Sequence, residues 1–360
     1  HVVSLKKNIV VTGSHGKTTT TSLIAKILSE GNLDPTIING GVVNSLGGSA
    51  KLGKGEWSVV EADESDGSFL NLPVNYSVIT NVDYEHLDFY KNYQNLKKAF
   101  TKFINKTPTL GKSFICIDSG DLKKISNKSK NKNFLTYGFN KKANYQIINS
   151  NYKKDYSYFD LKISLPLFKT KIIRNIKLNL IGSHNILNSV GAIALCSYIG
   201  IDLKVIKKSL KDFAGIQRRL TKVCEINGND FFDDYAHHPT EIKSVLDSLK
   251  KSNPEKRIIS VFQPHRYSRL KLLKKEFALS FKSSDRLILC PVYPAGEKID
   301  KQYDDKKFAT QIAKNSNVEV ILIYNQEDLY KFLKKNLLKD ELIIGMGAGS
   351  ITKWMREISF

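Results

Sequence analysis

Cysteine is scarce in this chain, and its placement excludes two of its common uses. Only four of the 360 residues are cysteine, and none belongs to a C-x-x-C pair. They are Cys116, Cys196, Cys224 and Cys290. A disulfide framework or a zinc site would need closer spacing, so we predict reduced cysteines and a cytoplasmic protein. Cys196 and Cys290 lie inside apolar runs and are expected to serve as small core residues.

Long hydrophobic runs are also missing. No apolar segment approaches the roughly 20 residues that a membrane-spanning helix needs, so we predict no membrane partner. The first residues, His1-Val2-Val3-Ser4, resemble neither a signal peptide nor the beginning of a domain, and we expect the chain to start within a longer protein. The hydrophobic content of 41% over 360 residues allows two domains with substantial cores.

Acidic residues are outnumbered, with 35 acidic against 56 basic side chains and a net charge of +21. Such an excess is typical of nucleic-acid-binding surfaces. Here it consists mostly of lysine in Lys/Asn/Ile-rich segments, without the rhythm of aromatic residues and arginine that marks a binding module. We interpret it as solvated surface that also attracts phosphorylated substrates, and we predict no nucleic-acid partner. A basic ATPase that acts on nucleic acid stays open as an alternative.

A glycine-rich turn joins an apolar run to a helical pattern near the start of the chain. Residues 8–12 predict a buried strand, and residues 18–29 predict a helix that ends at Gly31. Between them, Gly13-Ser14-His15-Gly16-Lys17-Thr18 has the composition of a phosphate-binding loop. The glycines allow backbone N–H groups to approach phosphate oxygens at the positive end of the helix.

The side chains of this loop predict the chemistry of a nucleoside triphosphate site. Lys17 would reach the outer phosphates, and the Thr18 hydroxyl would bind Mg²⁺. The pattern is G-x-x-G-K-T and not the longer G-x-x-x-x-G-K-T, because Val11 occupies the position of the first glycine. An ordinary strand-to-helix turn that contains a lysine is therefore an alternative interpretation.

Alternating strands and helices predict a mostly parallel sheet in the first part of the chain. The strands expected at 35–38, 57–60 and 77–80 are each followed by polar residues, and ligands gather at the carboxyl ends of such strands. Residues 121–180 alternate in polarity and predict an antiparallel excursion from the sheet. Helices are expected at 186–198 and 203–213, and we place the domain boundary between residues 214 and 215.

The second part of the chain predicts another α/β domain, of Rossmann-like type. We expect strands at 231–235, 257–262, 286–290, 318–323 and 342–344, and helices at 239–249 and after Tyr267. The run Gly345-Met346-Gly347-Ala348-Gly349 has no ribose-binding acid after it, so we interpret it as a tight strand-to-helix connection.

Polar side chains that could carry chemistry gather at the predicted strand ends and turns. Six of the seven histidines do so: His15, His86, His184, His237, His238 and His265. Glu61 ends a strand beside the loop and is expected to hold Mg²⁺, more so than Asp63, Glu64 or Asp66. His86 could bind a second metal ion, and Arg266 and Arg269 could bind a carboxylate or phosphate. No G-x-S-x-G motif occurs, so covalent catalysis is disfavoured.

Taken together and in order, these motifs resemble the Mur ligase family. The matching runs are Gly13 to Thr20, Glu61 to Asp66, His184-Asn185, Asp233 to Glu241, Phe262 to Arg269, and Val292 to Glu297. The last two resemble a member that adds L-alanine. The resemblance implies ATP-driven joining of L-alanine to the carboxylate of UDP-N-acetylmuramate through an acyl phosphate, in peptidoglycan synthesis.

The resemblance also implies roles for individual residues. Lys17, Glu61 and His86 would be catalytic, and Thr18, Glu61 and His86 would hold Mg²⁺. The implied ATP-binding residues are Gly13, Ser14, His15, Gly16, Lys17, Thr18, Thr19, His184, Asn185, Arg219 and Asp234. His237, Arg266 and Arg269 would bind the muramate or the amino acid.

The sequence departs from the family pattern in three ways. Ser14 stands where threonine is usual, and Pro294 stands where alanine is usual, which bears on the shape of the amino-acid pocket. Members of the family also carry an upstream domain that holds the uridine diphosphate, and this chain begins just before the ATP loop. A muropeptide ligase and a folylpolyglutamate ligase would share the loop, but the run from His265 to Arg269 argues against both. A homodimer is compatible with the sequence.

Overall fold

The chain is organised as two compact units, His1–Ile216 and Gln217–Phe360. The computed structural model describes residues 3–44 and 47–358. His1 and Val2, from which we expected the chain to start within a longer protein, lie outside the described residues. Each unit has its own sheet and its own buried core. The boundary from the contacts falls at residues 216 and 217, close to the one expected from the sequence.

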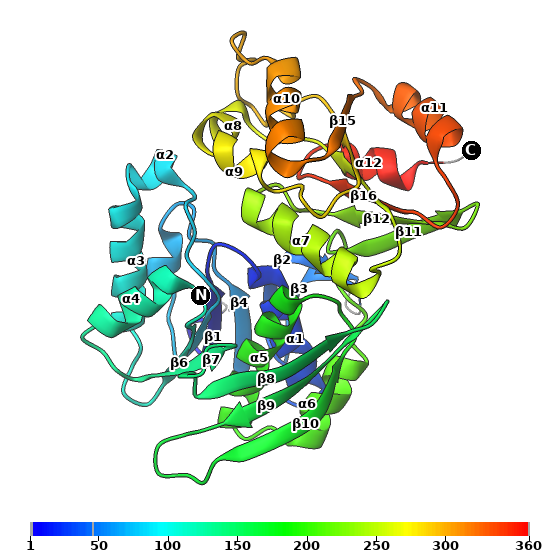
Figure 1. Ribbon diagram of the computed structural model, residues 1–360. Coiled ribbons are helices and arrows are strands. Elements are labelled where there is room, and N and C mark those ends of the chain that lie inside the picture. Colours follow the sequence, from blue (N-terminus) through cyan, green and yellow to red (C-terminus); the bar gives the residue numbers. More distant parts are fainter. Residues whose placement is uncertain (1–2, 45–46, 359–360) are drawn as a thin grey trace. The chain divides into compact units, whose positions relative to one another are not determined.

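The first unit is built on one large sheet (Figure 1). In the order β10-β9-β8-β7-β6-β5-β1-β4-β2-β3, the strands from β8 to β2 pair in parallel, and β3, β9 and β10 pair antiparallel with their neighbours. Their bounds are β1 Lys7–Thr12, β2 Thr36–Val43, β3 Gly48–Lys51, β4 Trp57–Glu61, β5 Tyr76–Ile79, β6 Lys112–Cys116, β7 Phe134–Gly138, β8 Tyr145–Tyr152, β9 Ser157–Ile163 and β10 Lys171–Leu178. The predicted mostly parallel sheet is confirmed.

Helices cover both faces of this sheet because β1 is apolar on both sides. Ile9 and Val11 pack on one face with α1, α5 and α6, whereas Val10 packs on the other face with α3 and α4. The helix bounds are α1 Lys17–Glu30, α2 Leu87–Tyr90, α3 Tyr93–Asn105, α4 Gly120–Lys128, α5 Ser183–Tyr198 and α6 Leu203–Lys211, with a 3₁₀ turn at Ser68–Asn71. Among the described residues, no helix is both long and apolar enough to cross a membrane.

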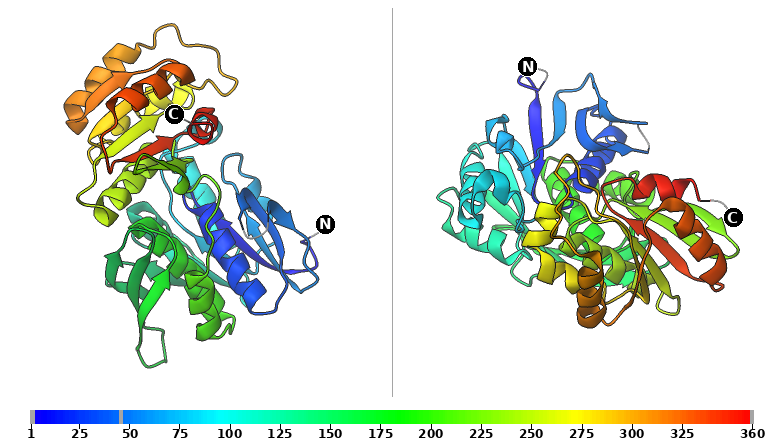
Figure 2. Two further views of the ribbon diagram at one scale, coloured as in Figure 1. Left: turned by 90° about the vertical axis from the view of Figure 1, so that its right-hand side faces the viewer. Right: turned by 90° about the horizontal axis from the view of Figure 1, so that it is seen from above.

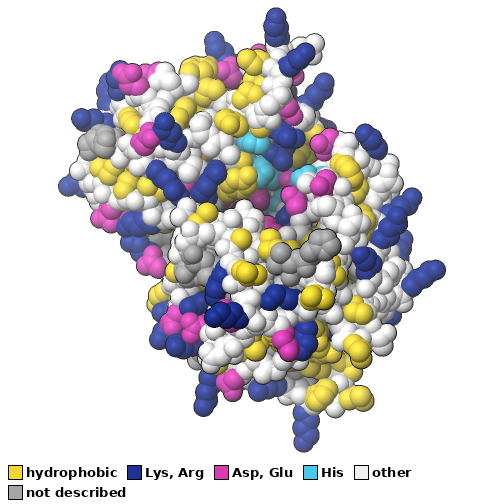
Figure 3. All heavy atoms as spheres, turned by 180° about the vertical axis from the view of Figure 1, so that it is seen from behind, with side chains coloured by type: hydrophobic (Ala, Val, Ile, Leu, Met, Phe, Trp, Pro, Cys, Tyr) yellow, Lys and Arg dark blue, Asp and Glu magenta, His cyan; other side chains and the backbone are white. Residues whose placement is uncertain are grey.

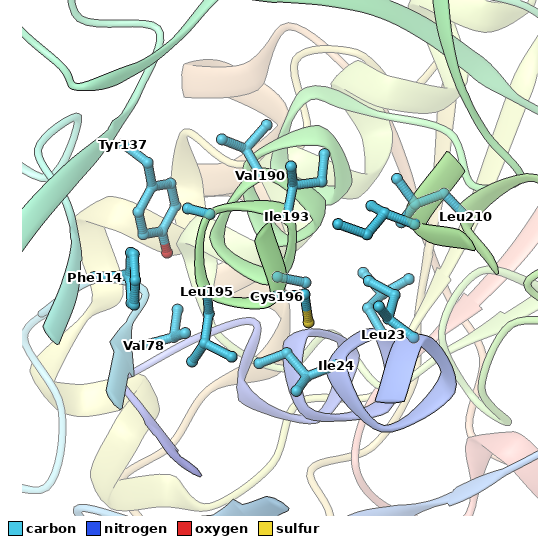
Figure 4. Close-up of a cluster of buried hydrophobic side chains, with 14 of the residues drawn as sticks. Leu23, Ile24, Val78, Phe114, Tyr137, Val190, Ile193, Leu195, Cys196 and Leu210 are labelled. Carbon is cyan, nitrogen blue, oxygen red and sulfur yellow. The ribbon is translucent and has the colours of Figure 1, made fainter. Parts of the chain in front are cut away.

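Helix α5 is the central element of the larger core (Figure 4). Its residues Val190, Ile193, Leu195 and Cys196 are fully buried and point in different directions around the helix, toward α1, α6 and the strands of the sheet. A helix that is apolar on all sides is stable only when it is enclosed. The expected core position of Cys196 is confirmed, and this packing fixes the start of α5 relative to the phosphate loop.

The second unit has a six-stranded sheet in the order β11-β12-β16-β13-β14-β15, parallel except for β11. The strands are β11 Thr221–Ile226, β12 Asn229–Asp234, β13 Ile258–Phe262, β14 Arg286–Leu289, β15 Glu319–Leu322 and β16 Leu342–Met346, and the helices are α7 Pro239–Ser252, α8 Tyr267–Leu272, α9 Lys274–Ala278, α10 Asp305–Ser316, α11 Gln326–Asn336 and α12 Ile351–Arg356. Strands β13 and β16 are buried along their whole length, which requires helices on both faces of the sheet (Figure 2). The predicted Rossmann-like α/β fold is confirmed.

Two sequence expectations about elements need correction. Residues 121–180 do not leave the sheet: α4 and the parallel strand β7 come first, and the antiparallel strands β8 to β10 extend the same sheet. The strand expected at 35–38 is longer than predicted, because β2 continues through Asn39, Gly40 and Gly41 to Val43. By contrast, Gly347 does form the expected tight connection, because a Cβ atom there would lie 2.8 Å from the Gln263 carbonyl oxygen.

Candidate active site

The glycine-rich sequence forms a tight turn between β1 and α1. Gly13 and Gly16 adopt φ angles of 134° and 81°. A Cβ atom at Gly13 would lie 2.1 Å from Thr80 Oγ1, and one at Gly16 would lie 2.4 Å from Asn188 Oδ1. Only glycine fits at these two positions, because they combine a left-handed backbone with close neighbours. Among the described residues, no side chain caps the start of α1, so its first N–H groups are available to an anion.

Residues that follow β5 brace the loop from the side. The Asn81 carbonyl accepts a hydrogen bond from Ser14 N at 3.1 Å, and Asn81 Oδ1 accepts one from His15 N at 2.8 Å. Thr80 Oγ1 donates to the His15 carbonyl at 2.6 Å, and Asp83 N donates to Ser14 Oγ at 2.9 Å. These contacts orient Ser14 and His15. Their only signal in the sequence was a polar run after a predicted strand.

Glu61, at the carboxyl end of β4, lies beside Thr18, in the first turn of α1. The Thr18 hydroxyl donates to Glu61 Oε1 at 2.9 Å, and Gly40 N donates to Glu61 Oε2 at 2.6 Å. Glu61 is the last residue of β4, which pairs in parallel with β1. The structure therefore brings together the two oxygen ligands that the sequence suggested for one cation.

Lys17 forms a close ion pair with Glu64, which the sequence suggested only as a weaker candidate for a magnesium ligand than Glu61. Lys17 Nζ lies 2.7 Å from Glu64 Oε2, and the Glu64 side chain is 0% exposed. Burial would raise the pKa of the Glu64 carboxyl, but the Lys17 ammonium and His86 outweigh it and hold that pKa at about 2. For Lys17, burial acts to lower the pKa, and the carboxylates of Glu64 and Asp63 raise it overall.

His86 joins the same group from the segment after β5. Its Nε2 atom lies 3.4 Å from Glu64 Oε1, and its backbone has a φ of 56°. Burial acts to lower the pKa of His86, whereas the contact with Glu64 raises it above its usual value. The ligand atoms of Asp63, Glu64 and His86 all lie within 4.8 Å of one another. The structure thus places His86 beside Glu64, while Thr18 and Glu61 form a separate pair.

The donor set fits a hard divalent cation. The Thr18 hydroxyl and the Glu61 carboxylate offer oxygen, which Mg²⁺ prefers. In the neighbouring group, the buried Oε1 atom of Glu64 lies 3.4 Å from His86 Nε2 and makes no hydrogen bond of ordinary geometry among the described residues. An acceptor of this kind can accommodate a cation or a water molecule bound to one. The residues present are therefore compatible with magnesium at this end of the sheet.

The start of α5 lies next to the phosphate loop. Asn188 contacts the Gly16 position, and Asn188 Nδ2 lies 3.5 Å from Asn185 Oδ1. Asn185 is buried and donates to the Ile181 carbonyl at 2.8 Å, while His184 is partly exposed at the first turn. Of the two predicted nucleotide-binding residues, His184 has a partly exposed side chain, whereas the side chain of Asn185 is buried and hydrogen-bonded to the backbone.

In the second unit, Asp234 organises the segment that carries Arg219. The two Asp234 oxygens accept hydrogen bonds from Leu220 N and Ala236 N, each at 2.7 Å. Burial raises the pKa of Asp234 to about 6, and the nearby Arg219 acts in the opposite direction. The Arg219 guanidinium also lies 5.2 Å from the centre of the Tyr235 ring. The two predicted residues are therefore neighbours, with Asp234 in a position to fix the loop that carries Arg219.

Three further predicted residues gather after β12 and β13. The rings of His237 and His265 lie 5.7 Å apart, and Arg269 Nη1 lies 3.4 Å from His265 Nδ1. The Tyr293 ring also stacks on the His265 ring, with centroids 5.5 Å apart. Arg266 is exposed and has a φ of 70°, and its N–H donates to the Tyr293 carbonyl at 2.9 Å. These side chains form a basic, aromatic cluster suited to a carboxylate.

We expect His265 to titrate far below the usual range for histidine. Burial, together with the charges of Arg269 and Arg266, lowers the pKa of His265 from 6.5 to about 4. The unfolded chain would bind a proton first, so this group should reduce stability as pH falls from 6.5 to 4. NMR titration of the imidazole should give a midpoint near pH 4, with the assignment made by His265→Gln. A midpoint near 6.5 would show that the ring is solvated.

Glu297 is a second residue whose role the sequence did not predict. Its carboxylate accepts hydrogen bonds from Ser268 N at 3.1 Å and from Ser268 Oγ at 2.5 Å, at the start of α8. Although burial would raise the pKa of Glu297, the bonds from Ser268 lower it. Glu297 therefore connects two loops of the cluster and fixes the turn that carries Arg266.

Two family models match the chain and follow its division into units. The Mur ligase middle domain matches residues 11–196, and the Mur ligase glutamate ligase domain matches residues 218–349. Together they cover most of the chain and contain both clusters of polar side chains. The chain belongs to the Mur ligase family, as the resemblance of its motifs suggested.

Individual relatives narrow this class to one kind of ligase. The UDP-N-acetylmuramate–L-alanine ligase of Pelagibacter ubique is 54% identical over 358 residues, which cover 99% of this chain and 77% of that relative. The ligase of the same name from Bartonella tribocorum is 37% identical, covering 98% of this chain and 74% of its own length. Among solved structures, the UDP-N-acetylmuramate–alanine ligase of Thermotoga maritima matches with a TM-score of 0.79 and 26% identity, covering 98% and 74% of the two chains.

Proposed function

We propose that this protein is an ATP-dependent ligase that joins L-alanine to the carboxylate of UDP-N-acetylmuramate in peptidoglycan synthesis. The observation that carries the proposal is the 54% identity, over 99% of this chain, to a relative named for that reaction. The local geometry supports it, because a phosphate loop and a Thr18–Glu61 pair lie at the carboxyl ends of parallel strands.

The first unit would bind the nucleotide. The backbone N–H groups of residues 13–19, on a turn that admits only glycine at two positions, would surround the phosphates. Lys17 would neutralise the outer phosphates, and His184 and Asn185, at the start of α5, would contact the rest of the nucleotide. In the second unit, Arg219 would bind the nucleotide on a segment held by Asp234.

Magnesium would be held by the oxygen ligands already brought together. Thr18 and Glu61, 2.9 Å apart, would bind one ion, and His86 would contribute to a second. When bound, the metal supplies positive charge that neutralises the phosphates and polarises the bond to be broken. The Gly40 N–H keeps the Glu61 carboxylate oriented, and the Glu64 contact does the same for His86.

The reaction would proceed in two displacements. The muramate carboxylate attacks the γ-phosphate of ATP, which gives an acyl phosphate and ADP. The amine of L-alanine then attacks the acyl carbon, loses a proton and expels phosphate, which leaves the amide. The protein supplies position and charge and no nucleophile. His237, Arg266 and Arg269 would bind the substrate carboxylates, since their cluster is basic and partly enclosed.

The remaining proposals concern partners and location. We propose a cytoplasmic enzyme with small-molecule substrates, and a homodimer stays a prediction. The alternative of a basic ATPase that acts on nucleic acid depends on the net charge of +21. Figure 3 does not support it, because the lysine and arginine side chains are spread over the visible face without forming one patch. The family accounts for the loop without nucleic acid.

A coupled assay of ADP release tests the function. The full-length protein should release ADP with UDP-N-acetylmuramate, Mg²⁺ and L-alanine, and release should fall to background when either substrate is omitted. Equal release with other amino acids or with a tripeptide would contradict the assignment and favour a peptide ligase. Stimulation of ATP hydrolysis by DNA or RNA at physiological ionic strength would instead favour the ATPase.

A further inference from the structure

Glu64 is a fully buried carboxylate to which the proposed reaction assigns no direct role. Its side chain is 0% exposed, whereas that of its neighbour Asp63 is 63% exposed. Removing a carboxylate from water costs several kcal/mol unless a charge of opposite sign and hydrogen bonds compensate it. The groups that compensate the buried charge of Glu64 therefore indicate the role of this residue.

Lys17 supplies most of that compensation. Its ammonium lies 2.7 Å from Glu64 Oε2 and 3.8 Å from Asp63 Oδ1, and the lysine side chain is 13% exposed. Water screens the charge of Asp63 but not that of Glu64, so the closer and buried partner dominates. In this arrangement Glu64 neutralises the Lys17 ammonium, which is the charge that the phosphate loop would direct to a nucleotide.

Of Lys17 and Glu64, the two members of the buried ion pair, Glu64 is the more firmly held. Its carbonyl accepts hydrogen bonds from Tyr90 OH at 2.5 Å and from Gly67 N at 3.2 Å, and His86 Nε2 lies 3.4 Å from its second carboxylate oxygen. None of these contacts involves Lys17. The lysine has a flexible four-carbon stem, and its hydrogen bond to the Ser14 carbonyl is long at 3.4 Å. Lys17 can therefore change partner while Glu64 stays in place.

We propose that Glu64 is a positioning residue that holds Lys17 before the nucleotide binds, and that the outer phosphates of ATP compete with it for the same ammonium group. This inference rests on the proposed function, in which Lys17 binds those phosphates. The ion pair keeps the lysine charged and oriented inside the site. It also lowers nucleotide affinity, because binding must weaken a buried contact.

Replacement of Glu64 by glutamine tests the competition. Glu64→Gln keeps the shape and the acceptor toward His86 but removes the charge, so Lys17 would be left with the phosphates as its main counter-ion. The dissociation constant of β,γ-imido-ATP with Mg²⁺, measured by calorimetry, should fall at least about tenfold, or 1.4 kcal/mol. Adenosine, which has no phosphate, should bind the parent and the variant equally.

Two further variants complete the test. Asp63→Asn removes an exposed charge near the same lysine and should leave affinity nearly unchanged. Glu64→Asp withdraws the carboxylate from Lys17 and should tighten binding by a smaller factor, which serves if the glutamine variant folds poorly. Unchanged or weaker affinity in Glu64→Gln would overturn the inference and make Glu64 a support that presents Lys17 to the phosphates. A parent protein that neither binds the analogue nor ligates L-alanine would instead overturn the proposed function.

Discussion

Replacing Glu61 with alanine should lower the turnover number by on the order of a thousandfold, because several kcal/mol of metal-based charge stabilisation would be lost. The Thr18 hydroxyl would lose its acceptor at 2.9 Å and the Gly40 N–H its acceptor at 2.6 Å. Both groups can turn to water, since Glu61 is only partly buried, so the free energy of unfolding should change by about 1 kcal/mol. Steady-state ligation and urea unfolding measure the two effects.

An exposed carboxylate a short way along the same segment provides the matched control for Glu61→Ala. Asp66 accepts a hydrogen bond from Ser68 N at 2.9 Å and is exposed, so Asp66→Asn should retain turnover close to the parent. A metal role also predicts that raising Mg²⁺ rescues part of the activity of Glu61→Asp and none of that of Glu61→Ala. Full activity of Glu61→Ala at saturating Mg²⁺ would exclude Glu61 as a ligand.

Local sequence was enough to predict the loop and its helix. The two glycines, the lysine and threonine after them, and Gly31 at the helix end are signals that act within a few residues. The same is true of Glu61, because a carboxylate that ends a buried strand must emerge at the edge of the sheet. What these residues share is that neighbours along the chain decide their position.

The support for the loop could not be predicted in this way, since it comes from a distant strand. Asn81 and Thr80 bond to residues that are more than sixty positions earlier, and only the pairing of β5 with β1 brings them there. The burial of Glu64 and its ion pair with Lys17 were not predicted for a related reason. It and Asp63 look alike in sequence, and it is the packing around β4 and α2 that leaves one exposed and buries the other.

The extent of the first sheet was missed because polar composition concealed it. Residues 145–178 are rich in lysine and asparagine, and we expected them to leave the sheet. In the structure, β8 to β10 extend the same sheet with one face buried, where Tyr145, Ile147 and Phe159 join the main core. A strand that is covered on one face only needs apolar residues at every second position, and polar residues can occupy the positions between them.

Replacing Lys17 with methionine should abolish ligation and also destabilise the first unit. Methionine keeps an unbranched stem in a side chain that is one atom shorter, but it removes the ammonium, so the outer phosphates would lose their main cation. Glu64, at 0% exposure, would lose the partner 2.7 Å away. Leaving one member of a buried ion pair without its partner costs about 3–5 kcal/mol, so urea unfolding of Lys17→Met should shift by that amount.

A double variant separates these two effects of Lys17. With the charge of Glu64 also removed, in Lys17→Met/Glu64→Gln, no buried charge is left uncompensated, and most of the lost stability should return. Ligation should not return, because the phosphates would still lack the ammonium. The loss in Lys17→Met should grow as pH rises from 5 to 8, since without Lys17 only His86 would oppose the effect of burial, and the pKa of the Glu64 carboxyl would rise. If the double variant were as unstable as Lys17→Met, the cost would arise from packing of the methionine and not from the charge of Glu64.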